Sequence, residues 1–413
     1  MSSLRYWIPV EVGAGKVKRE NSVVAVAVDF PRLINQFTDQ WFNPDSVTVY
    51  DENQQEIPSQ YDSFDETVSW IISGVMQPQE KRSYKIGFDV LGRELPFKTR
   101  YPRYTSNVDL ADMGGSLRIN VGGSIWGGRH FTTYIYGGDS VTALGVGGDL
   151  GGPLWKPSFC PVNGPLGNLV RDSEDEHPHQ HGLYISYGAH ISAEGTNIWA
   201  ETVKGPWGPC GRIVHEAFES CTNGPVYGRF VEQLTYTKPD GYKFMAETRD
   251  VKVYNLPAEN MMMDLASTLT CPNEVGVRSV RINIRVANSI REMDGGRIEN
   301  SEGGVGQEQT SREKAKWVDY SGPVGAGVNG IAAFDHESNP GFPTEWGTNA
   351  GPMALVGASY PFPDDFPLHG ILRLKWRFYV HDGDAGKGKV NDKYLDYSTP
   401  LDITLGKPDE VKQ

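Results

Sequence analysis

The chain has 413 residues and is rich in glycine (48), proline (27) and aromatic side chains (10 Trp, 19 Tyr and 16 Phe). This length predicts two or three domains, and the abundance of turn-forming and aromatic residues favours strands over helices. The formal net charge of -13 argues against nucleic acid as a partner, and no segment has the roughly 20 consecutive apolar residues that span a membrane.

The first residues and the cysteines bear on the cellular compartment. Residues 1–7 contain no apolar signal core, which predicts a cytoplasmic protein, or a periplasmic or secreted one whose leader has been removed. The 4 cysteines have no short paired spacing, so we expect neither a zinc site nor a dense disulfide scaffold.

Residues 1–102 are predicted to form a small accessory β domain. Residues 23–28 are an uninterrupted apolar strand, and residues 46–50 alternate between polar and apolar side chains with the period of a half-buried strand. One short helix is predicted, around residues 31–37.

Residues 103–405 are predicted to form a large antiparallel β-sandwich. Glycine doublets punctuate short strands up to residue 152, and because no helical pattern follows them they fit tight strand connections better than a phosphate loop. Residues 280–286 and 370–381 carry charged or polar side chains at every second position, as a strand with one face in water or facing a cleft does. Residues 406–413 are expected to be a frayed tail. The predicted fold class is therefore all-β, with a small N-terminal sandwich followed by a large one.

Three histidines, His177, His179 and His181, stand at alternate positions. On an extended strand they would project to the same side about 6–7 Å apart, where imidazoles can share acid–base chemistry or bind a transition metal. Acidic residues in the segment 172–176 would raise the basicity of these imidazoles or add oxygen ligands. A solvated polar loop is the alternative, which Pro178 favours.

Arg129, His130, Tyr134 and Tyr136 form a second candidate set. A guanidinium can pair with a carboxylate, and a nearby His or Tyr can transfer a proton. This combination suits β-elimination on a uronic acid, in which the carboxylate is neutralised, the C5 proton is abstracted and the leaving oxygen is protonated. Strand residues that face water are an equal alternative.

A third set of candidates lies in the C-terminal half. Asp319 and Asp335 are carboxylates of the kind that glycoside hydrolysis uses, but the sequence does not fix their separation, which decides the mechanism. Arg377 and His381 end a strand at a turn, where site residues and turn residues are both common. Four tryptophans are candidate sugar-stacking platforms, although each alone is more often part of a core: Trp126, Trp155, Trp207 and Trp346.

From about residue 150 to residue 385 the chain resembles a bacterial family of unknown activity that is catalogued under a methane-oxygenase label and accompanies sugar-oxidising and sugar-cleaving genes. The family usually reads His-Pro-His-His-Arg-Gly, so His177 and His179 carry over, whereas His181 stands where an arginine is usual. The resemblance thus implies a two-histidine acid–base or two-ligand site and makes His181 the doubtful member. The methane label has no weight, because the chain has no transmembrane bundle. The matching segments are 156–157, 161–165, 177–183, 197–201, 211–215, 317–322, 335–340 and 377–383.

The resemblance also implies a fold. The family's sandwich is similar to the galactose-mutarotase supersandwich, a scaffold shared by mutarotases, many lyases and domains of some hydrolases. Residues 46–51 and 56–61 look like the accessory β domain that precedes the catalytic sandwich in several polysaccharide lyases. Fold analogy of this kind raises the expectation of a sugar ligand without choosing the reaction.

The leading hypothesis is a carbohydrate-active lyase that cleaves a uronate-containing oligo- or polysaccharide by β-elimination. The alternatives are a glycoside hydrolase that uses Asp319, Asp335 or Glu201, and a non-catalytic carbohydrate-binding protein. A divalent metal at His177 and His179 is left open, as is the oligomeric state. The predicted catalytic residues are His177, His179, Arg129, His130, Tyr134, Asp319 and His336. The predicted substrate-binding residues are Tyr136, His181, Trp126, Asp335, Asn339, Arg377 and His381.

Overall fold

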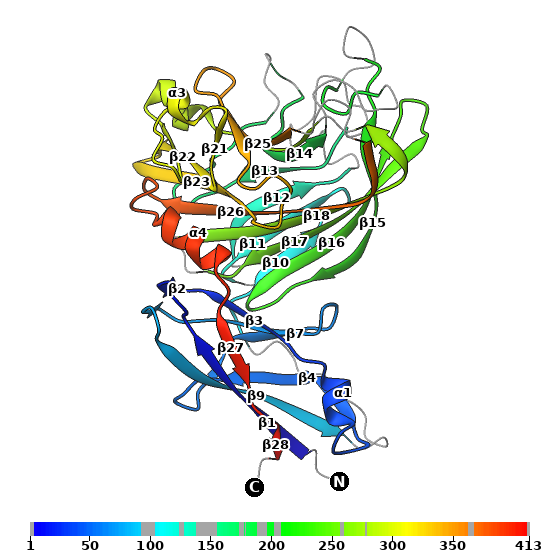
Figure 1. Ribbon diagram of the computed structural model, residues 1–413, viewed down its shortest axis with the longest axis vertical. Helices are drawn as coiled ribbons and strands as arrows, with labels where there is room; N and C mark the ends of the chain where they lie inside the picture. The colour runs from blue at the N-terminus through cyan, green and yellow to red at the C-terminus, as the bar shows by residue number, and fades with distance from the viewer. Residues whose placement is uncertain are drawn as a thin grey trace. The chain divides into compact units, whose positions relative to one another are not determined.

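The computed structural model describes residues 4–91, 104–123, 128–137, 155–172, 177, 179–187, 196–201, 208–256, 260–276, 279–361 and 367–410. Within these ranges the chain is almost entirely β-structure, and short helices are few (Figure 1). The prediction of an all-β sandwich is confirmed. The chain divides into two compact units, the first made of Met1–Asn107, Gly224–Tyr227 and Asp392–Gln413, and the second of Val108–Asn223 and Gly228–Asn391.

The first unit is built on a six-stranded antiparallel sheet of order β27-β1-β9-β4-β5, in which β28 also pairs with β1. A three-stranded sheet of order β3-β7-β6, a β2-β8 pair and the helix α1 complete it. The bounds are β1 Leu4–Gly13, β2 Arg19–Glu20, β3 Val23–Ala27, α1 Phe30–Ile34, β4 Trp41–Tyr50, β5 Glu56–Ile57, β6 Ser59–Asp62, β7 Thr67–Ile71, β8 Val75–Met76, β9 Lys81–Leu91, β27 Asp402–Leu405 and β28 Asp409–Glu410.

Alternating apolar side chains form the core of this unit. Val24 and Val26 of β3 are buried, as are Ile86 and Phe88 of β9, because every second side chain of a strand points to the same face. The helix α1 begins where the Asp29 side chain accepts a hydrogen bond from a backbone N–H of its first turn, close to the predicted helix.

The C-terminal segment belongs to the sheet of the first unit. Leu405 of β27 lies opposite Val10, and Glu410 of β28 lies opposite Tyr6. The sequence predicted that the N-terminal domain ends at residue 102 and that residues 406–413 are a frayed tail. In the structure the first unit also includes residues from the C-terminal end of the chain. The physical reason for the difference is that both strands are short and largely exposed: β27 has four residues, and β28 consists of Asp409 and Glu410 alone, which carry no apolar pattern.

The second unit contains a nine-stranded sheet of order β10-β11-β12-β13-β14-β19-β25-β24-β21 and an eight-stranded sheet of order β15-β16-β17-β18-β26-β23-β22-β20. Strands of the first are β10 Val108–Asp112, β11 Ser116–Val121, β12 Arg129–Ile135, β13 Ser158–Val162, β14 Leu183–Tyr187, β19 Ser279–Arg285, β21 Glu313–Lys314, β24 Glu345–Thr348 and β25 Leu355–Pro361. Strands of the second are β15 Arg212–Thr222, β16 Tyr227–Thr237, β17 Lys243–Tyr254, β18 Asn260–Gly276, β20 Arg297–Asn300, β22 Trp317–Val324, β23 Gly327–Asp335 and β26 Pro367–Asp382. The helices are η1 Asn288–Ile290, η2 Glu292–Asp294, α3 Gln307–Thr310 and α4 Val390–Ser398.

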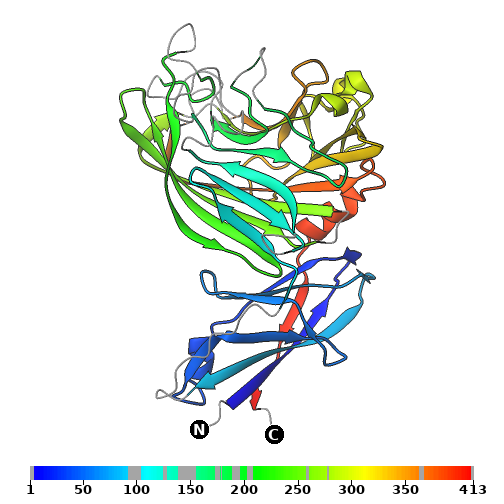
Figure 2. The ribbon, with the colours of Figure 1, turned by 180° about the vertical axis from the view of Figure 1, so that it is seen from behind.

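One hydrophobic core joins the two large sheets. It includes Tyr134 and Leu183 of the nine-stranded sheet and Phe230 and Leu265 of the eight-stranded sheet, so the two sheets form a sandwich, seen from behind in Figure 2. The predicted glycine turns are illustrated by Gly114, which lies between β10 and β11 with a φ of 76° that glycine adopts readily. None of the described helices is long and apolar enough to cross a membrane.

Candidate functional site

The candidate site lies on the face of the nine-stranded sheet that points away from the core, which we call the outer face. Every second side chain of β14 and β19 belongs to the core, namely Leu183, Ile185, Ile282 and Ile284. Because neighbours along a strand point to opposite sides, the residues between them lie on the outer face. These residues are polar: Tyr184, Ser186, Asn283 and Arg285.

His181 precedes β14 and is held between two carboxylates. Its Nδ1 donates to Asp172 Oδ1 at 2.6 Å, and its Nε2 donates to Glu201 Oε2 at 2.8 Å. The other oxygen of Glu201 is 2.9 Å from Lys156 Nζ. The side chains of His181, Glu201 and Lys156 are at most 5% exposed, so two cations and two carboxylates alternate largely out of water. We call the series Asp172–His181–Glu201–Lys156 the ion chain.

The members of the ion chain shift one another's pKa values. Burial alone would lower the pKa of His181, but the carboxylates of Glu201 and Asp172 outweigh burial and raise it to about 9. Burial alone would raise the pKa of Glu201, but His181 and Lys156 outweigh burial and lower it to about 2. At neutral pH, His181 is therefore an imidazolium and Glu201 a carboxylate.

The free energy of unfolding is expected to fall as the pH rises through about 9. The pKa of His181 in the folded protein, about 9, lies above the 6.5 of a free histidine, so its protonation stabilises the fold fully below pH 6.5 and the contribution disappears as it deprotonates. Denaturant unfolding at several pH values measures this. In His181→Gln the decrease over the same pH range should be smaller, and an equal decrease in both proteins would contradict the assignment.

His177 and His179 differ from His181 in being partly exposed. The ring of His179 is 5.8 Å from the ring of His177 and 5.8 Å from the ring of Trp199. Burial, and next the charge of Lys156, lower the pKa of His179 to about 4. His179 is therefore a neutral imidazole at neutral pH and is able to accept a proton.

Arg285 of β19 ties the histidine segment to the sheet. Its Nη1 donates to the backbone oxygen of His177 at 2.7 Å and to that of Gln180 at 3.3 Å. His177 Nδ1 and Gln180 Oε1 are buried and have no hydrogen-bond partner within the described chain. Buried polar atoms without a partner are rare, and they point to a ligand or water that completes them.

The three-histidine metal site considered from the sequence does not form. Both ring nitrogens of His181 contact carboxylates, so His181 has no nitrogen left for a metal. Among the described residues, no group of three or more His, Cys, Asp or Glu side chains is placed to hold a metal ion. A metal held by His177 and His179 alone stays a prediction.

The second predicted set, on β12, is divided between several environments. His130 Nε2 lies 2.9 Å from Thr133 Oγ1, and Tyr136 donates to Asp112 Oδ1 at 2.5 Å. Tyr134 is fully buried in the core. The register of β12 shifts against both neighbouring strands, and such bulges change the face to which a side chain points. Arg129, at the start of β12, lies opposite Val121.

Most residues of the third predicted set make buried hydrogen bonds in and around the eight-stranded sheet. His381 Nε2 is 2.8 Å from Asp319 Oδ1, and both side chains have no exposed surface. Burial alone would lower the pKa of His381, but the neighbouring carboxylate of Asp319 has the larger effect, so the pKa is raised above the value of a free histidine. Asp335 is also fully buried and accepts hydrogen bonds from Asn339 Nδ2 at 2.8 Å and from the backbone of Thr344 at 2.9 Å. The structure therefore does not expose Asp319 and Asp335 as a carboxylate pair.

The remaining predicted residues lie elsewhere. Arg377 pairs with Asp264 through two hydrogen bonds of 2.5 and 2.7 Å, on adjacent strands of the eight-stranded sheet. His336 contacts Ser338 Oγ at 2.7 Å, and burial together with Lys375 lowers its pKa. Of the candidate tryptophans, Trp126 and Trp207 lie outside the described residues, Trp346 is buried, and Trp155 has the Arg212 guanidinium 4.1 Å above its ring.

Sequence reasoning missed a second buried polar network, which lies between the two large sheets. His215 Nδ1 is 2.7 Å from Glu232 Oε1, and Tyr134 donates to the other oxygen of Glu232. Arg249 donates to Tyr134 at 2.9 Å and pairs with Glu247 at 2.9 and 3.0 Å. The available signal was the presence of charged residues at core-facing positions of β16 and β17.

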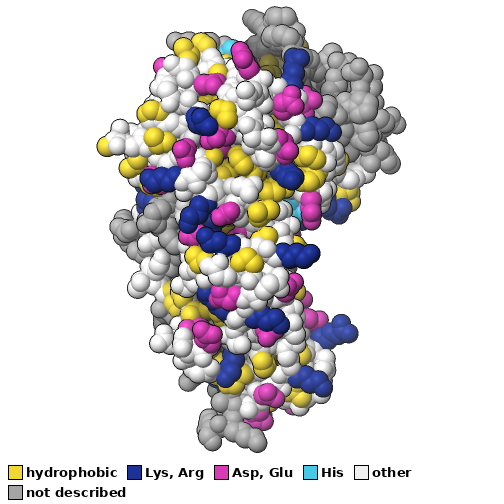
Figure 3. Space-filling view, turned by 60° about the vertical axis from the view of Figure 1, so that its left-hand side comes forward, with side chains coloured by type: hydrophobic (Ala, Val, Ile, Leu, Met, Phe, Trp, Pro, Cys, Tyr) yellow, Lys and Arg dark blue, Asp and Glu magenta, His cyan; other side chains and the backbone are white. Residues whose placement is uncertain are grey.

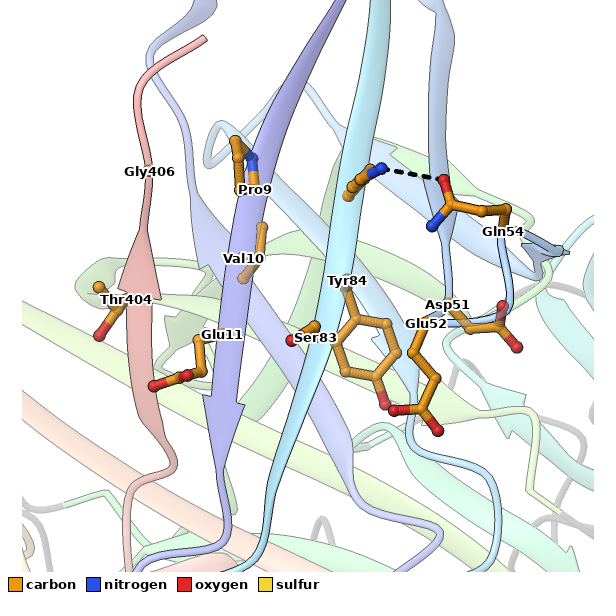
Figure 4. Close-up of a pocket in the computed structure, with 11 residues that line it drawn as sticks. Pro9, Val10, Glu11, Asp51, Glu52, Gln54, Ser83, Tyr84, Thr404 and Gly406 are labelled. Atoms are coloured by element: carbon orange, nitrogen blue, oxygen red, sulfur yellow. Dashed lines mark hydrogen bonds between the residues drawn. The ribbon is translucent and has the colours of Figure 1, made fainter. Parts of the chain in front are cut away.

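A separate hollow lies in the first unit. This pocket of about 420 Å³ is formed by β1, β9, β27 and the turn that follows β4, and Figure 4 shows the acidic side chains of Glu11, Asp51 and Glu52 there. Lys81 pairs with Glu11 at 2.6 Å, and Lys85 donates to Gln54 at 3.0 Å. The pocket holds no acid–base pair comparable to the histidine site. Over the face drawn in Figure 3, acidic and basic side chains are interspersed, which does not match the extended basic surface that nucleic acid requires.

One family model matches most of the second unit, and two solved structures align with nearly the whole chain at low sequence identity. A model of the family described as "Family of unknown function (DUF6807)" matches residues 125–395. No curated protein matches the chain. The chain is similar to a protein of glycosyl hydrolase family 38 from Enterococcus faecalis, with 9% identity and a TM-score of 0.47 over 97% of this chain and 47% of that one. It is also similar to an alpha-mannosidase from Enterococcus faecalis V583, with 10% identity and a TM-score of 0.47 over 98% of this chain and 46% of that one. The chain thus spans about half the length of these two structures.

Proposed function

The chain belongs to the family of unknown function DUF6807, and we propose that it is a carbohydrate-active enzyme, a lyase that cleaves a uronate-containing glycan by β-elimination. The observation that carries the proposal is the contrast between His179 and His181. An imidazole that is neutral at neutral pH and partly exposed stands beside a buried one that is charged at neutral pH. This arrangement provides a neutral base beside a charged network that holds the histidine segment in place.

In the proposed reaction, His179 removes the C5 proton of the uronate. The electron pair of the C–H bond forms the C4–C5 double bond, the bond from C4 to the leaving oxygen breaks, and His177 gives that oxygen a proton. The substrate carboxylate must be neutralised so that the C5 proton becomes acidic. We assign this role to Arg212 rather than to Arg129, because Arg212 interacts electrostatically with Glu201 of the ion chain.

The carboxylates support the hydrolase alternative less well. A hydrolase needs a carboxylic acid with a raised pKa to protonate the leaving group, whereas the pKa of Glu201 is lowered to about 2. Asp319 and Asp335 are fully buried and hydrogen-bonded within the protein. A non-catalytic carbohydrate-binding protein is distinguished from both by the absence of any product.

The proposal is tested by incubating the protein with a panel of uronate-containing oligo- and polysaccharides. A lyase generates an unsaturated uronyl product that absorbs in the ultraviolet, so the absorbance should increase with time. New reducing ends without this absorbance would indicate the hydrolase instead. Binding without either product would indicate the non-catalytic alternative, and silence across the whole panel would exclude the uronate lyase.

The pH profile of the reaction is expected to have an unusually low acidic limb. The base must be unprotonated, so kcat/KM should hold from neutral pH to about pH 5 and fall about tenfold per unit below about pH 4, where His179 becomes protonated. Initial rates measured across this range, with folding checked by circular dichroism at each pH, give the limb. A limb near pH 6.5, the value of a free histidine, would contradict the assignment of His179 as the base.

A further inference from the structure

A row of residues crosses the outer face next to the histidine site. Strand register aligns Ser158 of β13 with Tyr184 of β14, Tyr184 with Asn283 of β19, Asn283 with Gly357 of β25, and Gly357 with Gly347 of β24. We call these five residues the outer row. Neighbouring strands are about 4.8 Å apart, so the row spans roughly 14 Å from Tyr184 to Gly347.

The outer row begins at the histidine site. The ring of Tyr184 is 6.5 Å from the ring of His181 and 6.4 Å from that of Trp199. Lys156 Nζ, a member of the ion chain, lies 5.3 Å from the centre of the Tyr184 ring. A ligand seated against His179 and Trp199 therefore has Tyr184 as its neighbour on the sheet.

The far end of the row is bare backbone. Trp346 and Val356 belong to the core, so the glycines that follow each of them lie on the outer face. Gly347 is exposed, and a Cβ added there would meet just one atom within 4 Å, the oxygen of Gly357 at 3.8 Å. A Cβ at Gly357 would lie 3.0 Å from Asn283 Oδ1. Gly357 is itself buried, so the exposed backbone at this end of the row is that of Gly347.

Two residues, Ser158 on the row and Gln180 in the histidine segment, have buried polar atoms without a partner among the described residues. Ser158 Oγ is on the row itself, 1% exposed and without a hydrogen-bond partner in the described ranges. Gln180 is 2% exposed, its Oε1 has no partner, and its Nε2 donates to Met353 Sδ, in the turn between β24 and β25. A buried hydroxyl and a buried amide oxygen that lack partners destabilise a fold unless a ligand or water completes them. Sugar hydroxyls, which both donate and accept, match this requirement.

We infer that the outer row is an extended subsite, which binds the sugar residues adjoining the one at His179. The ligand is then an oligosaccharide or a polymer rather than a single sugar. The exposed backbone at Gly347 accommodates the face of one sugar ring, and Asn283, Ser158 and Gln180, which lie nearer the histidine site, bind hydroxyl groups of the rings between that one and His179. This inference rests on the proposed function for the identity of the ligand class.

The test uses Gly347→Leu, which places a bulky side chain on this exposed backbone at a position of ordinary backbone conformation. Binding of uronate oligosaccharides, from disaccharide to hexasaccharide, is measured by titration calorimetry in the His179→Gln background, in which cleavage is slow. The affinity of the parent should rise with oligosaccharide length. Gly347→Leu should lower the affinity for the hexasaccharide at least tenfold and leave the disaccharide unchanged, and Ser158→Ala should also weaken the longer ligands.

Gly386→Leu is the matched control. Gly386 is exposed, has an ordinary φ, and its added Cβ would meet Asp384 Oδ1 at 3.4 Å, so this variant should bind every length as the parent does. A parent whose affinity does not rise with length, an equal loss at all lengths, or no loss in Gly347→Leu would overturn the inference, as would no binding at any length. Length-dependent binding by a protein that never forms an unsaturated product would instead overturn the proposed lyase and leave the subsite in place.

Discussion

Replacing His179 with glutamine is expected to lower kcat/KM on the cleaved glycan by a factor of about 100 or more. A positioned general base contributes on the order of 100- to 10,000-fold to a proton transfer, and glutamine has a similar size but cannot accept the proton. His179 is partly exposed, so the free energy of unfolding should change by less than about 1 kcal/mol. Initial rates and denaturant unfolding on the same preparation measure both effects.

A second variant separates a lost base from a displaced substrate. In His179→Ala, added imidazole should restore part of the activity, because a small base is able to enter the space left by the side chain. The restored rate should increase with the fraction of imidazole that is unprotonated. Full activity in His179→Gln, or a loss that appears in KM alone, would contradict the role of His179 as the base.

Replacing Glu201 with glutamine is expected to destabilise the second unit by about 3–5 kcal/mol. Glu201 lies between His181 and Lys156, and its removal leaves two buried cations with one remaining carboxylate, Asp172. Breaking a buried ion pair on one side costs this much because the other charge stays buried without compensation. Thermal and denaturant unfolding of the variant give the change.

Glu216→Gln is the matched control for Glu201→Gln. Glu216 pairs with Lys243 at 2.7 Å, but the two side chains are 38% and 61% exposed. Exposed pairs contribute at most about 1 kcal/mol, so this variant should unfold almost as the parent does. Equal destabilisation by the two variants would show that the ion chain has no special energetic role.

Several features of the fold were predictable because they depend on local patterns. The period-two alternation of residues 46–50 and 280–286 identified strands that the structure contains as parts of β4 and β19. β27 was not predictable, because its largely exposed residues form a strand only by hydrogen bonding to β1, which lies almost 400 positions earlier in the chain. The inward direction of Tyr134 was also hidden, since a register shift within a sheet leaves no signature in composition.

The sequence could locate the segment that contains the candidate site, but not how its side chains are arranged in space. The spacing of the histidines located the segment, whereas the different roles of His179 and His181 depend on Asp172, Glu201 and Lys156, which reach it from other segments. His181 was the doubtful member because an arginine is usual at its position in the family that the chain resembles.

The pairing of β27 and β28 with β1 also has a consequence for biosynthesis. The six-stranded sheet combines residues 4–13 with residues 402–410, while residues 108–223 and 228–391 form a unit with a core of its own. During translation, β1 and its partner β9 emerge from the ribosome early, whereas β27 and β28, which pair along the other edge of β1, emerge last. The larger sandwich is able to fold first, and the N-terminal strand must wait with one edge open until the last strands arrive.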